Sequence, residues 1–251
     1  MGAISRILAL AALGLALTVF PAAAKDEVRV KASAVAPGFK APAGTMQILL
    51  FEPETAVSEQ TAGGLAVLNA DWTASARRAL VDALDEALAE RGAKLNSAAA
   101  LALADEPLMK DYRALFRAIA SAAFTHKLFP GDTLPTKRDR FDWSLGPGAS
   151  QLKKFGAGNY GLFVYTSDVY DSRERRAVET VGKLLGQPEQ RGTHIGYAGL
   201  VDLETGDLVW INANIRMDGD LRTGAGASLR ASQLLQGFPK REVAIMRGNG
   251  G

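Results

Sequence analysis

Hydrophobic positions along the chain fall into runs of strand length and stripes of helical spacing. The apolar run from Met46 to Glu54 is closed by Pro53 and predicts a buried strand covered on both faces. Residues 159–170 are rich in aromatic and β-branched side chains and predict a second strand. Residues 195–203 and 208–215 flank a tight turn and predict an antiparallel hairpin.

The helical pattern is clearest in the segment that follows Gly63-Gly64. Its apolar side chains lie four apart, with Asp71 or Thr73 as the N-cap and Gly92 as the stop. This stripe consists of Trp72, Ala76, Leu80, Leu84 and Leu88. We expect the stripe to face the core.

Three further helices are expected. One begins at the cap Asp105 with Pro107 near its first position, runs to about His126, and presents Leu108, Tyr112, Leu115, Phe116 and Ile119 on one stripe. Residues 173–186 are compatible with a helix. A final helix follows loops at 218–220 and at the Gly224/Gly226 pair, and it ends near Gly237.

The order of these elements predicts the fold class. Strands interleaved with helices, together with one antiparallel hairpin, indicate a single α/β domain with a mixed β-sheet covered by helices. We place this domain at residues 46–245, after an extended lead-in at 25–45 and before a frayed tail at 246–251. Residues 129–158 are rich in proline, glycine and charge and predict a long loop with a short helical turn near 150–155.

Residues 1–24 have the pattern of a secretory signal peptide. Arg6 precedes an apolar stretch from Ile7 to Phe20, and Ala22 and Ala24 frame a cleavage site before Lys25. An uncleaved anchor is the alternative, but the stretch is shorter than the roughly 20 residues that cross a bilayer. We expect export to the periplasm with cleavage near Ala24, and no lipid anchor, because the chain has no cysteine to acylate.

Composition narrows the function classes. The 251 residues are 47% hydrophobic, and 29 basic and 27 acidic side chains give a net charge of +2. Such balance offers no broad cationic field, so a nucleic-acid partner is not expected. Without cysteine the chain has no disulfides, and we expect packing to supply its stability.

Motifs for cofactors and metals are weak. The two histidines, His126 and His194, are interpreted as structural, because imidazole metal sites need several convergent ligands. The string GAGNYG at 156–161 matches a dinucleotide fingerprint in letters, but it precedes a strand instead of opening a helix. We expect no metal and no cofactor.

The acidic, tryptophan-containing part of the long loop is the best candidate for a ligand site. Asp142 and Trp143, with Arg138 and Arg140, combine chemistry that is common in carbohydrate contacts. The favoured alternative is structural, with Asp142 capping a turn through Ser144 and Trp143 filling the core.

Other charged residues are possible sites. The candidates for a pair of acids across a cleft are Asp139 with Asp142 and Asp168 with Asp171. The DGD at 218–220 is interpreted as an exposed turn, and the arginines at 173, 175 and 176 as a solvated helix face.

The hairpin GLVDLETGDLVWIN carries a resemblance. It follows a strand that ends in YTSD and precedes the C-terminal helix. In this context it resembles the pattern of a strand, a D-x-x-T-G turn and a second strand with tryptophan in exported proteins of the CsgG, LpoB and TolB N-terminal-domain type. The resemblance covers the first strand, the first helix and the hairpin, and it implies a compact α/β domain that serves as a non-catalytic envelope accessory. Those groups are usually lipoproteins, and the loop RDRFDWSLGPG has no match in them, so no functional residue is transferred.

Two functions follow as hypotheses. The first is a non-enzymatic periplasmic accessory or interaction module whose partner is another envelope protein or component, of unspecified oligomeric state. The alternative is a secreted hydrolase or carbohydrate-binding protein that uses the loop around Asp142. The hairpin residues Asp202, Thr205, Gly206 and Trp210 are assigned structural roles in either case, the first three in the turn and Trp210 on a buried strand face.

Overall fold

The computed structural model describes residues 31–98, 105–128, 134–137, 140–184 and 192–240. The predicted signal peptide and the predicted frayed tail therefore lie outside the described residues. The helices are α1 (Ala70–Ala89), α2 (Glu106–Ala123), α3 (Arg173–Leu184) and α4 (Gly224–Leu234), with a π-helical turn at Phe124–Leu128 and a 3-10 helix at Pro147–Phe155. The strands are β1 (Lys31–Val35), β2 (Met46–Leu50), β3 (Glu54–Gln60), β4 (Ala66–Leu68), β5 (Ala93–Ser97), β6 (Tyr160–Asp171), β7 (His194–Asp202) and β8 (Leu208–Asn214).

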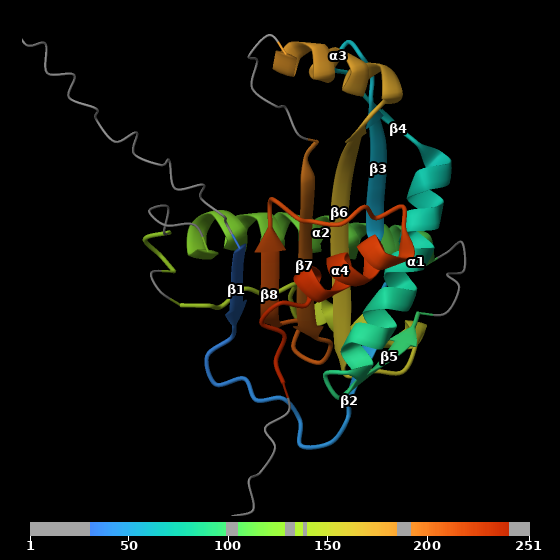
Figure 1. Ribbon diagram of the computed structural model, residues 1–251. Coiled ribbons are helices and arrows are strands. Elements are labelled where there is room, and N and C mark those ends of the chain that lie inside the picture. Colours follow the sequence, from blue (N-terminus) through green and yellow to red (C-terminus); the bar gives the residue numbers. More distant parts are fainter. Residues whose placement is uncertain (1–30, 99–104, 129–133, 138–139, 185–191, 241–251) are drawn as a thin grey trace, which may run out of the picture.

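The eight strands form one mixed sheet, as the sequence predicts (Figure 1). Along the sheet the order is β1-β8-β7-β6-β2-β5, and β3 continues beside β6 where β2 ends. The pairings of β2 with β5 and of β6 with β2 and β3 are parallel, and the others are antiparallel. The prediction of a mixed α/β sheet with an antiparallel hairpin is confirmed.

Helices cover both faces of the sheet (Figure 1). On one face α1 and α4 pack over Ile48, Leu162 and Leu200, which are fully buried. On the other face α2 and the segment 141–155 pack over Leu49, Phe51 and Phe163. Alternate residues of β2 and β6 thus enter different cores, because successive side chains of a strand point to opposite faces.

One end of the sheet extends past α2, while α1 and α4 still bind its other face through Thr73 and Arg230. We call this projection the arm; it consists of β3, β4, residues 165–171 of β6, and α3 (Figure 1). The strand β6 is 12 residues long and belongs to both parts, since its first residues pair with β2 and its last seven pair with β3.

Several predicted boundaries were wrong. The single strand expected at Met46 to Glu54 ends at Leu50, and after Pro53 a separate strand, β3, begins. Neither β3 nor β5 was predicted, because both carry polar side chains and lack a continuous apolar run. The expected lead-in contains β1, which pairs with β8, so the sheet begins before residue 46.

The helix ends also differ from expectation. The N-cap of α1 is Asn69, whose side chain accepts a hydrogen bond from the Trp72 backbone N–H at 3.0 Å. Thr73 lies inside the helix, where its hydroxyl accepts a hydrogen bond from the Val57 N–H of β3. In α2, Phe116 of the predicted stripe is buried, whereas Leu115 of the same stripe is 40% exposed and Met109, outside it, is buried. The expected loop at Gly224 and Gly226 is the first turn of α4.

Part of the long segment 129–158 is closely tied to the hairpin. The Leu145 N–H donates to the Gly206 carbonyl at 2.8 Å, and the Leu208 N–H donates to the Trp143 carbonyl at 2.9 Å. The short helical turn expected near 150–155 is the longer 3-10 helix at Pro147–Phe155.

No helix in the described ranges is both long enough and apolar enough to span a bilayer.

Replacing Trp210 tests the α4-covered core. Its side chain is fully buried and meets Phe238 edge to face, with ring centroids 5.2 Å apart. We expect Trp210→Ala to lower the free energy of unfolding by about 3–5 kcal/mol in urea titrations, because a large cavity remains. Leu229→Ala, at a residue 45% exposed on α4, is the control and is expected to stay within about 0.5 kcal/mol of the parent. Equal stability of the Trp210→Ala variant and the parent would contradict this core assignment.

Candidate functional site

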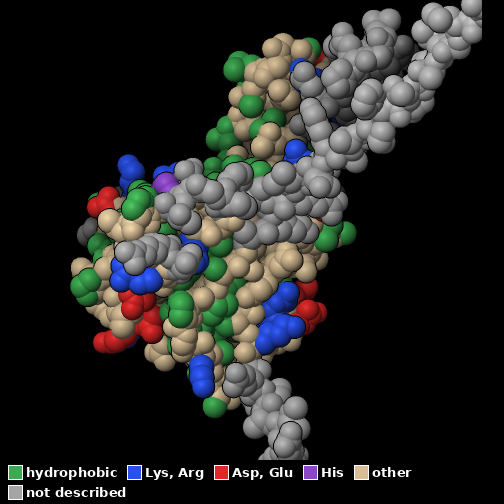
Figure 2. All heavy atoms as spheres, turned by 90° about the vertical axis from the view of Figure 1, so that its left-hand side faces the viewer, with side chains coloured by type: hydrophobic (Ala, Val, Ile, Leu, Met, Phe, Trp, Pro, Cys, Tyr) green, Lys and Arg blue, Asp and Glu red, His purple; other side chains and the backbone are tan. Residues whose placement is uncertain are grey.

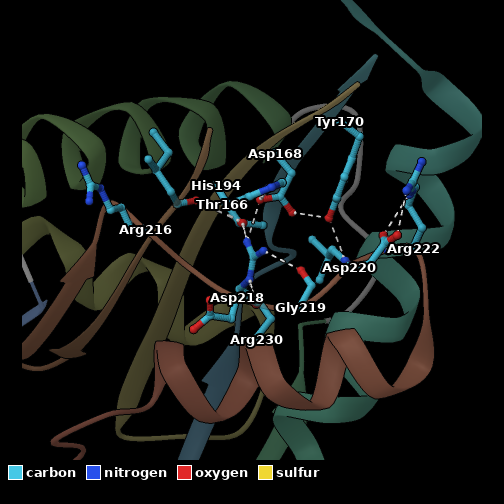
Figure 3. A network of polar contacts seen from close by, with 12 residues as sticks. Thr166, Asp168, Tyr170, His194, Arg216, Asp218, Gly219, Asp220, Arg222 and Arg230 are labelled. Carbon is cyan, nitrogen blue, oxygen red and sulfur yellow. Dashed lines mark hydrogen bonds and ion pairs between the residues drawn. The ribbon is translucent and has the colours of Figure 1, made fainter. Parts of the chain in front are cut away.

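A buried arginine stands at the centre of a network of polar contacts (Figure 3). Arg230 of α4 has no exposed side-chain surface. Its Nη1 donates to Asp168 Oδ1 at 2.7 Å and to Thr166 Oγ1 at 3.1 Å. Its Nη2 donates to the Gly219 carbonyl at 3.1 Å, and its Nε to the Asp218 carbonyl at 3.4 Å. The guanidinium is therefore bound on each of its nitrogens.

The partner carboxylate is equally buried and equally occupied. Asp168 of β6 has no exposed side-chain surface and is shared by three neighbours. In addition to Arg230, His194 Nδ1 lies 3.1 Å from Oδ1, and the Tyr170 hydroxyl donates to Oδ2 at 3.3 Å. Such a set of partners offsets the cost of burying a carboxyl group away from water.

Strand alternation and a loop place these groups together. Thr166, Asp168 and Tyr170 are two apart on β6 and so point to the same face, the one that α4 covers. His194 opens β7 and is the register partner of Asp168. The loop at 218–220 supplies the two carbonyls that Arg230 requires.

A glycine allows that loop to approach α4. A side chain at Gly226, in the first turn of α4, would place its Cβ 2.0 Å from the Asp220 carbonyl oxygen. The sequence DGDLRTGAG was expected to form an exposed turn and a loop. Asp218 is exposed, as expected, but the carbonyls of Asp218 and Gly219 also bind Arg230, a role that the sequence did not predict.

Tyr170 links the cluster to a neighbouring arginine. Its hydroxyl accepts a hydrogen bond from the Leu221 N–H at 2.8 Å, and Arg222 lies 4.1 Å from its ring centroid. Burial, and then the negative charge of Asp168, raise the pKa of the Tyr170 phenol well above its ordinary value. Arg222 also lies over Trp72 of α1 and binds Asp220 with two nitrogens, at 2.8 and 2.7 Å. The hydrogen bonds from Arg222 lower the pKa of Asp220.

These contacts make the cluster a junction between α4, α1 and the sheet. Asp168 is occupied by three partners and has no exposed surface, so a solute has no path to it. No group of three or more His, Asp or Glu side chains within the described ranges could hold a metal ion. The geometry is that of a buried ion pair that fixes the position of α4.

The candidate ligand site around Asp142 is arranged differently from a carbohydrate subsite. Asp142 Oδ1 accepts from Lys137 Nζ at 2.8 Å, and this hydrogen bond lowers the pKa of the carboxyl. Trp143 is 8% exposed and packs in the α2-covered core, so its indole face is not available for stacking on a sugar. Arg140 contacts Asp142 at 3.8 Å, whereas Arg138 and Asp139 lie outside the described residues.

The expected turn, in which Asp142 caps through Ser144, does not form, because each of the two side chains binds a different residue. The Ser144 hydroxyl donates to the Gly206 carbonyl and accepts from the Gly146 N–H. It thus joins the long segment to the hairpin turn, and Asp142 is held by Lys137 instead.

The acid pair Asp168 and Asp171 is separated by the strand. Asp168 and Asp171 are three residues apart on β6, so their side chains leave opposite faces. Asp171 binds Arg175 at 3.1 Å, which gives this arginine an ion pair at the start of α3. The neighbouring Arg173 and Arg176 are exposed.

The hairpin turn has the local contacts that its residue types predict. Asp202 Oδ1 accepts from the Glu204 N–H at 2.8 Å, and Thr205 Oγ1 accepts from the Asp207 N–H at 3.1 Å. Gly206 has a φ of +80°, and a Cβ there would lie 1.9 Å from the Gly146 carbonyl oxygen. Both the turn and the segment packed on it therefore require glycine.

Sequence reasoning missed Arg230, Thr166 and Tyr170 as members of one cluster. A signal was present in α4, where Arg230 interrupts the buried stripe of Ala227, Ala231 and Leu234. An arginine at a stripe position needs a buried carboxylate, and Asp168 on an inward-facing strand position is the matching signal. Neither signal shows which carboxylate binds Arg230.

Comparisons with known proteins give a distant structural likeness only. No protein-family model and no curated protein matches the chain. Two solved structures of PelC dodecamers from Paraburkholderia phytofirmans are similar. One is 11% identical and covers 84% of this chain and 99% of that chain with a TM-score of 0.36. The other is 12% identical and covers 84% of this chain and 98% of that chain, also with a TM-score of 0.36. Likeness at this level does not identify the protein.

A double-mutant cycle tests the ion pair. We expect Asp168→Asn to lower the free energy of unfolding by about 3–5 kcal/mol, because Arg230 is left buried without its counter-charge. The double variant Asp168→Asn with Arg230→Met is expected to lose less than the sum of the single changes Asp168→Asn and Arg230→Met, by about 1 kcal/mol or more. His194→Gln, at the outer edge of the cluster, is the control and is expected to cost about 1 kcal/mol or less. Strict additivity in chemical denaturation would show that the two charges are not coupled.

Alkaline titration tests the burial of Tyr170. Since its pKa is raised in the folded state, the group favours folding below the unfolded-state pKa of about 10, and this contribution is lost as the pH rises above that value. We expect the phenolate absorbance of the native protein to develop at higher pH than that of the unfolded protein. Tyr170→Phe is expected to lose part of this lag and to unfold less steeply with rising pH. Superimposable native and unfolded titration curves would contradict the burial.

Proposed function

We propose that this protein acts by binding a protein partner in the bacterial envelope through the arm, and not by catalysing a reaction. The observation that carries the proposal is the exposed apolar surface on β4 and the turn before it. Leu65 is 68% exposed, Val67 50% and Leu68 61%, and they follow one another closely in the chain. Hydrophobic side chains lie on the surface of the projecting arm in Figure 2. Grouped apolar side chains on such a projection are typical of a protein contact site.

The arrangement of the reactive groups supports the proposal. Asp168, His194 and Arg230 bind one another and hold α4 on the sheet. Asp142 is bound to Lys137 beside a buried tryptophan. The ionisable side chains that the sequence offered for chemistry thus have structural partners in the described part of the chain.

The envelope location rests on the N-terminal sequence pattern. A short basic start, an apolar stretch and small residues before Lys25 are typical of a secretory signal. A cysteine-free chain suits an oxidising compartment, because it cannot form wrong disulfides there. The resemblance to non-catalytic envelope accessories agrees with this location.

Site-specific cross-linking tests the proposal. The chain, with its own N-terminal sequence, is produced in bacteria with a photo-reactive amino acid at Leu68, and the matched control carries it at Leu229 of α4. We expect a protein adduct from Leu68 in the periplasmic fraction and about tenfold less adduct from Leu229, because only the arm binds a partner. Equal adduct from the two positions, or none, would rule the arm out as a contact site, and protein confined to the cytoplasm would rule out the location.

A further inference from the structure

Within the described residues the sheet has three edge strands, and they differ in the features that prevent an edge from pairing with another strand. The edge strands β1 and β5 each contain a lysine, Lys31 and Lys94. The edge strand β4 contains only Ala66, Val67 and Leu68, and the whole stretch 61–70 has no charged residue and no proline. Charged side chains and proline are the usual devices that keep a free edge from pairing with another strand. The β4 edge has neither charge nor proline; its only protection is its length of three residues, so it is open to pairing over those residues.

Hydrogen bonds around β4 show which backbone groups face away from β3. The Asn69 N–H donates to the Val57 carbonyl, and the Thr61 N–H donates to the Leu65 carbonyl, each at 2.9 Å. In an antiparallel ladder bonded and non-bonded pairs alternate, so the β4 residue bonded to β3 between these two is Val67. The N–H and C=O groups of Ala66 and Leu68 therefore point outward from the sheet.

We infer that the β4 edge pairs antiparallel with the β4 edge of a second copy of this chain, about a two-fold axis at Val67. Ala66 of one copy then bonds to Leu68 of the other, and the two Val67 residues lie opposite each other. The inference rests on the proposed function, because it names the occupant of the same surface.

Two features favour a second copy as the occupant. An isologous contact requires one surface to complement itself, and an uncharged apolar strand does so without bringing like charges together. The pairing also places apolar side chains together on both faces of the joined strands, with Val67 on one face and Ala66 and Leu68 on the other. Each β4 strand is only three residues long, so we expect the pairing to be reversible and to depend on concentration.

A cysteine at the axis gives a direct test, because the chain has no cysteine of its own. Directly opposed residues of a non-bonded antiparallel pair have Cα atoms about 4.5 Å apart, within disulfide range. We expect purified Val67→Cys protein to form a covalent dimer with a mild oxidant. Leu68→Cys is the register control and is expected to link about tenfold less, since Leu68 faces Ala66 of the copy and diagonal neighbours lie roughly 7–8 Å apart. Equal linking of both variants, or none, would overturn the two-fold register.

Sedimentation of the purified protein over a range of concentrations gives the second test. We expect a monomer–dimer equilibrium that Leu68→Lys weakens by about tenfold or more, as edge lysines do. Leu115→Lys, on the 40% exposed Leu115 of α2, is expected to leave it unchanged. A monomer at all concentrations, or a dimer that survives Leu68→Lys, would overturn the inference. If the arm then still cross-links to a different protein in cells, the proposed function stands and only the occupant is wrong.

Discussion

The ion pair between Arg230 and Asp168 is the constraint on which the packing of one whole face depends. The two residues are 62 positions apart in the chain and both have no exposed side-chain surface. Burying either charge alone would cost several kcal/mol, and the pair is tolerated because nearly every polar atom of both groups is bonded. Meeting that condition fixes the height of α4 above the sheet, the path of the 218–220 loop over the guanidinium, and the close approach at Gly226. A buried network of this kind is sensitive to geometry, which gives α4 one position instead of several.

The strand β6 connects this ion pair to the arm, because it belongs to both the body and the arm. Its first residues lie between β2 and β7 in the body, and its last residues lie beside β3, beyond the cover of α2. Asp168 and Tyr170 belong to that second part, so the polar junction sits where the body passes into the arm. Arg222, held between Trp72 and Tyr170, joins α1 to the same place. The arm is thereby an extension of a braced strand, and its apolar edge strand is presented at a fixed position.

Much of the body could be predicted from the sequence, because its strands and helices bury one face and their apolar residues therefore recur at regular spacing. Residues 46–50 and 160–171, the hairpin at 194–214 and the helix at 70–89 carry continuous or alternating apolar positions. The strands β3, β4 and β5 were missed because they lie at edges or on the arm, where one face or both are wet and no apolar pattern is required. The start of α1 was misplaced because Asn69, Asp71 and Thr73, at alternate positions, are all residue types that cap helices, and Thr73 instead binds β3.

The sequence by itself determined the elements of the core, the fold class and the turn chemistry of the hairpin, since each depends on neighbours a few positions away. Only the tertiary structure decided that Asp168 binds Arg230, that Asp142 binds Lys137, and that the stretch around Val67 is left without cover. The physical reason is that periodicity and turn preference are local properties of the chain. The partner of a charge and the exposure of an edge are set by how distant segments pack, and no spacing along the sequence encodes that.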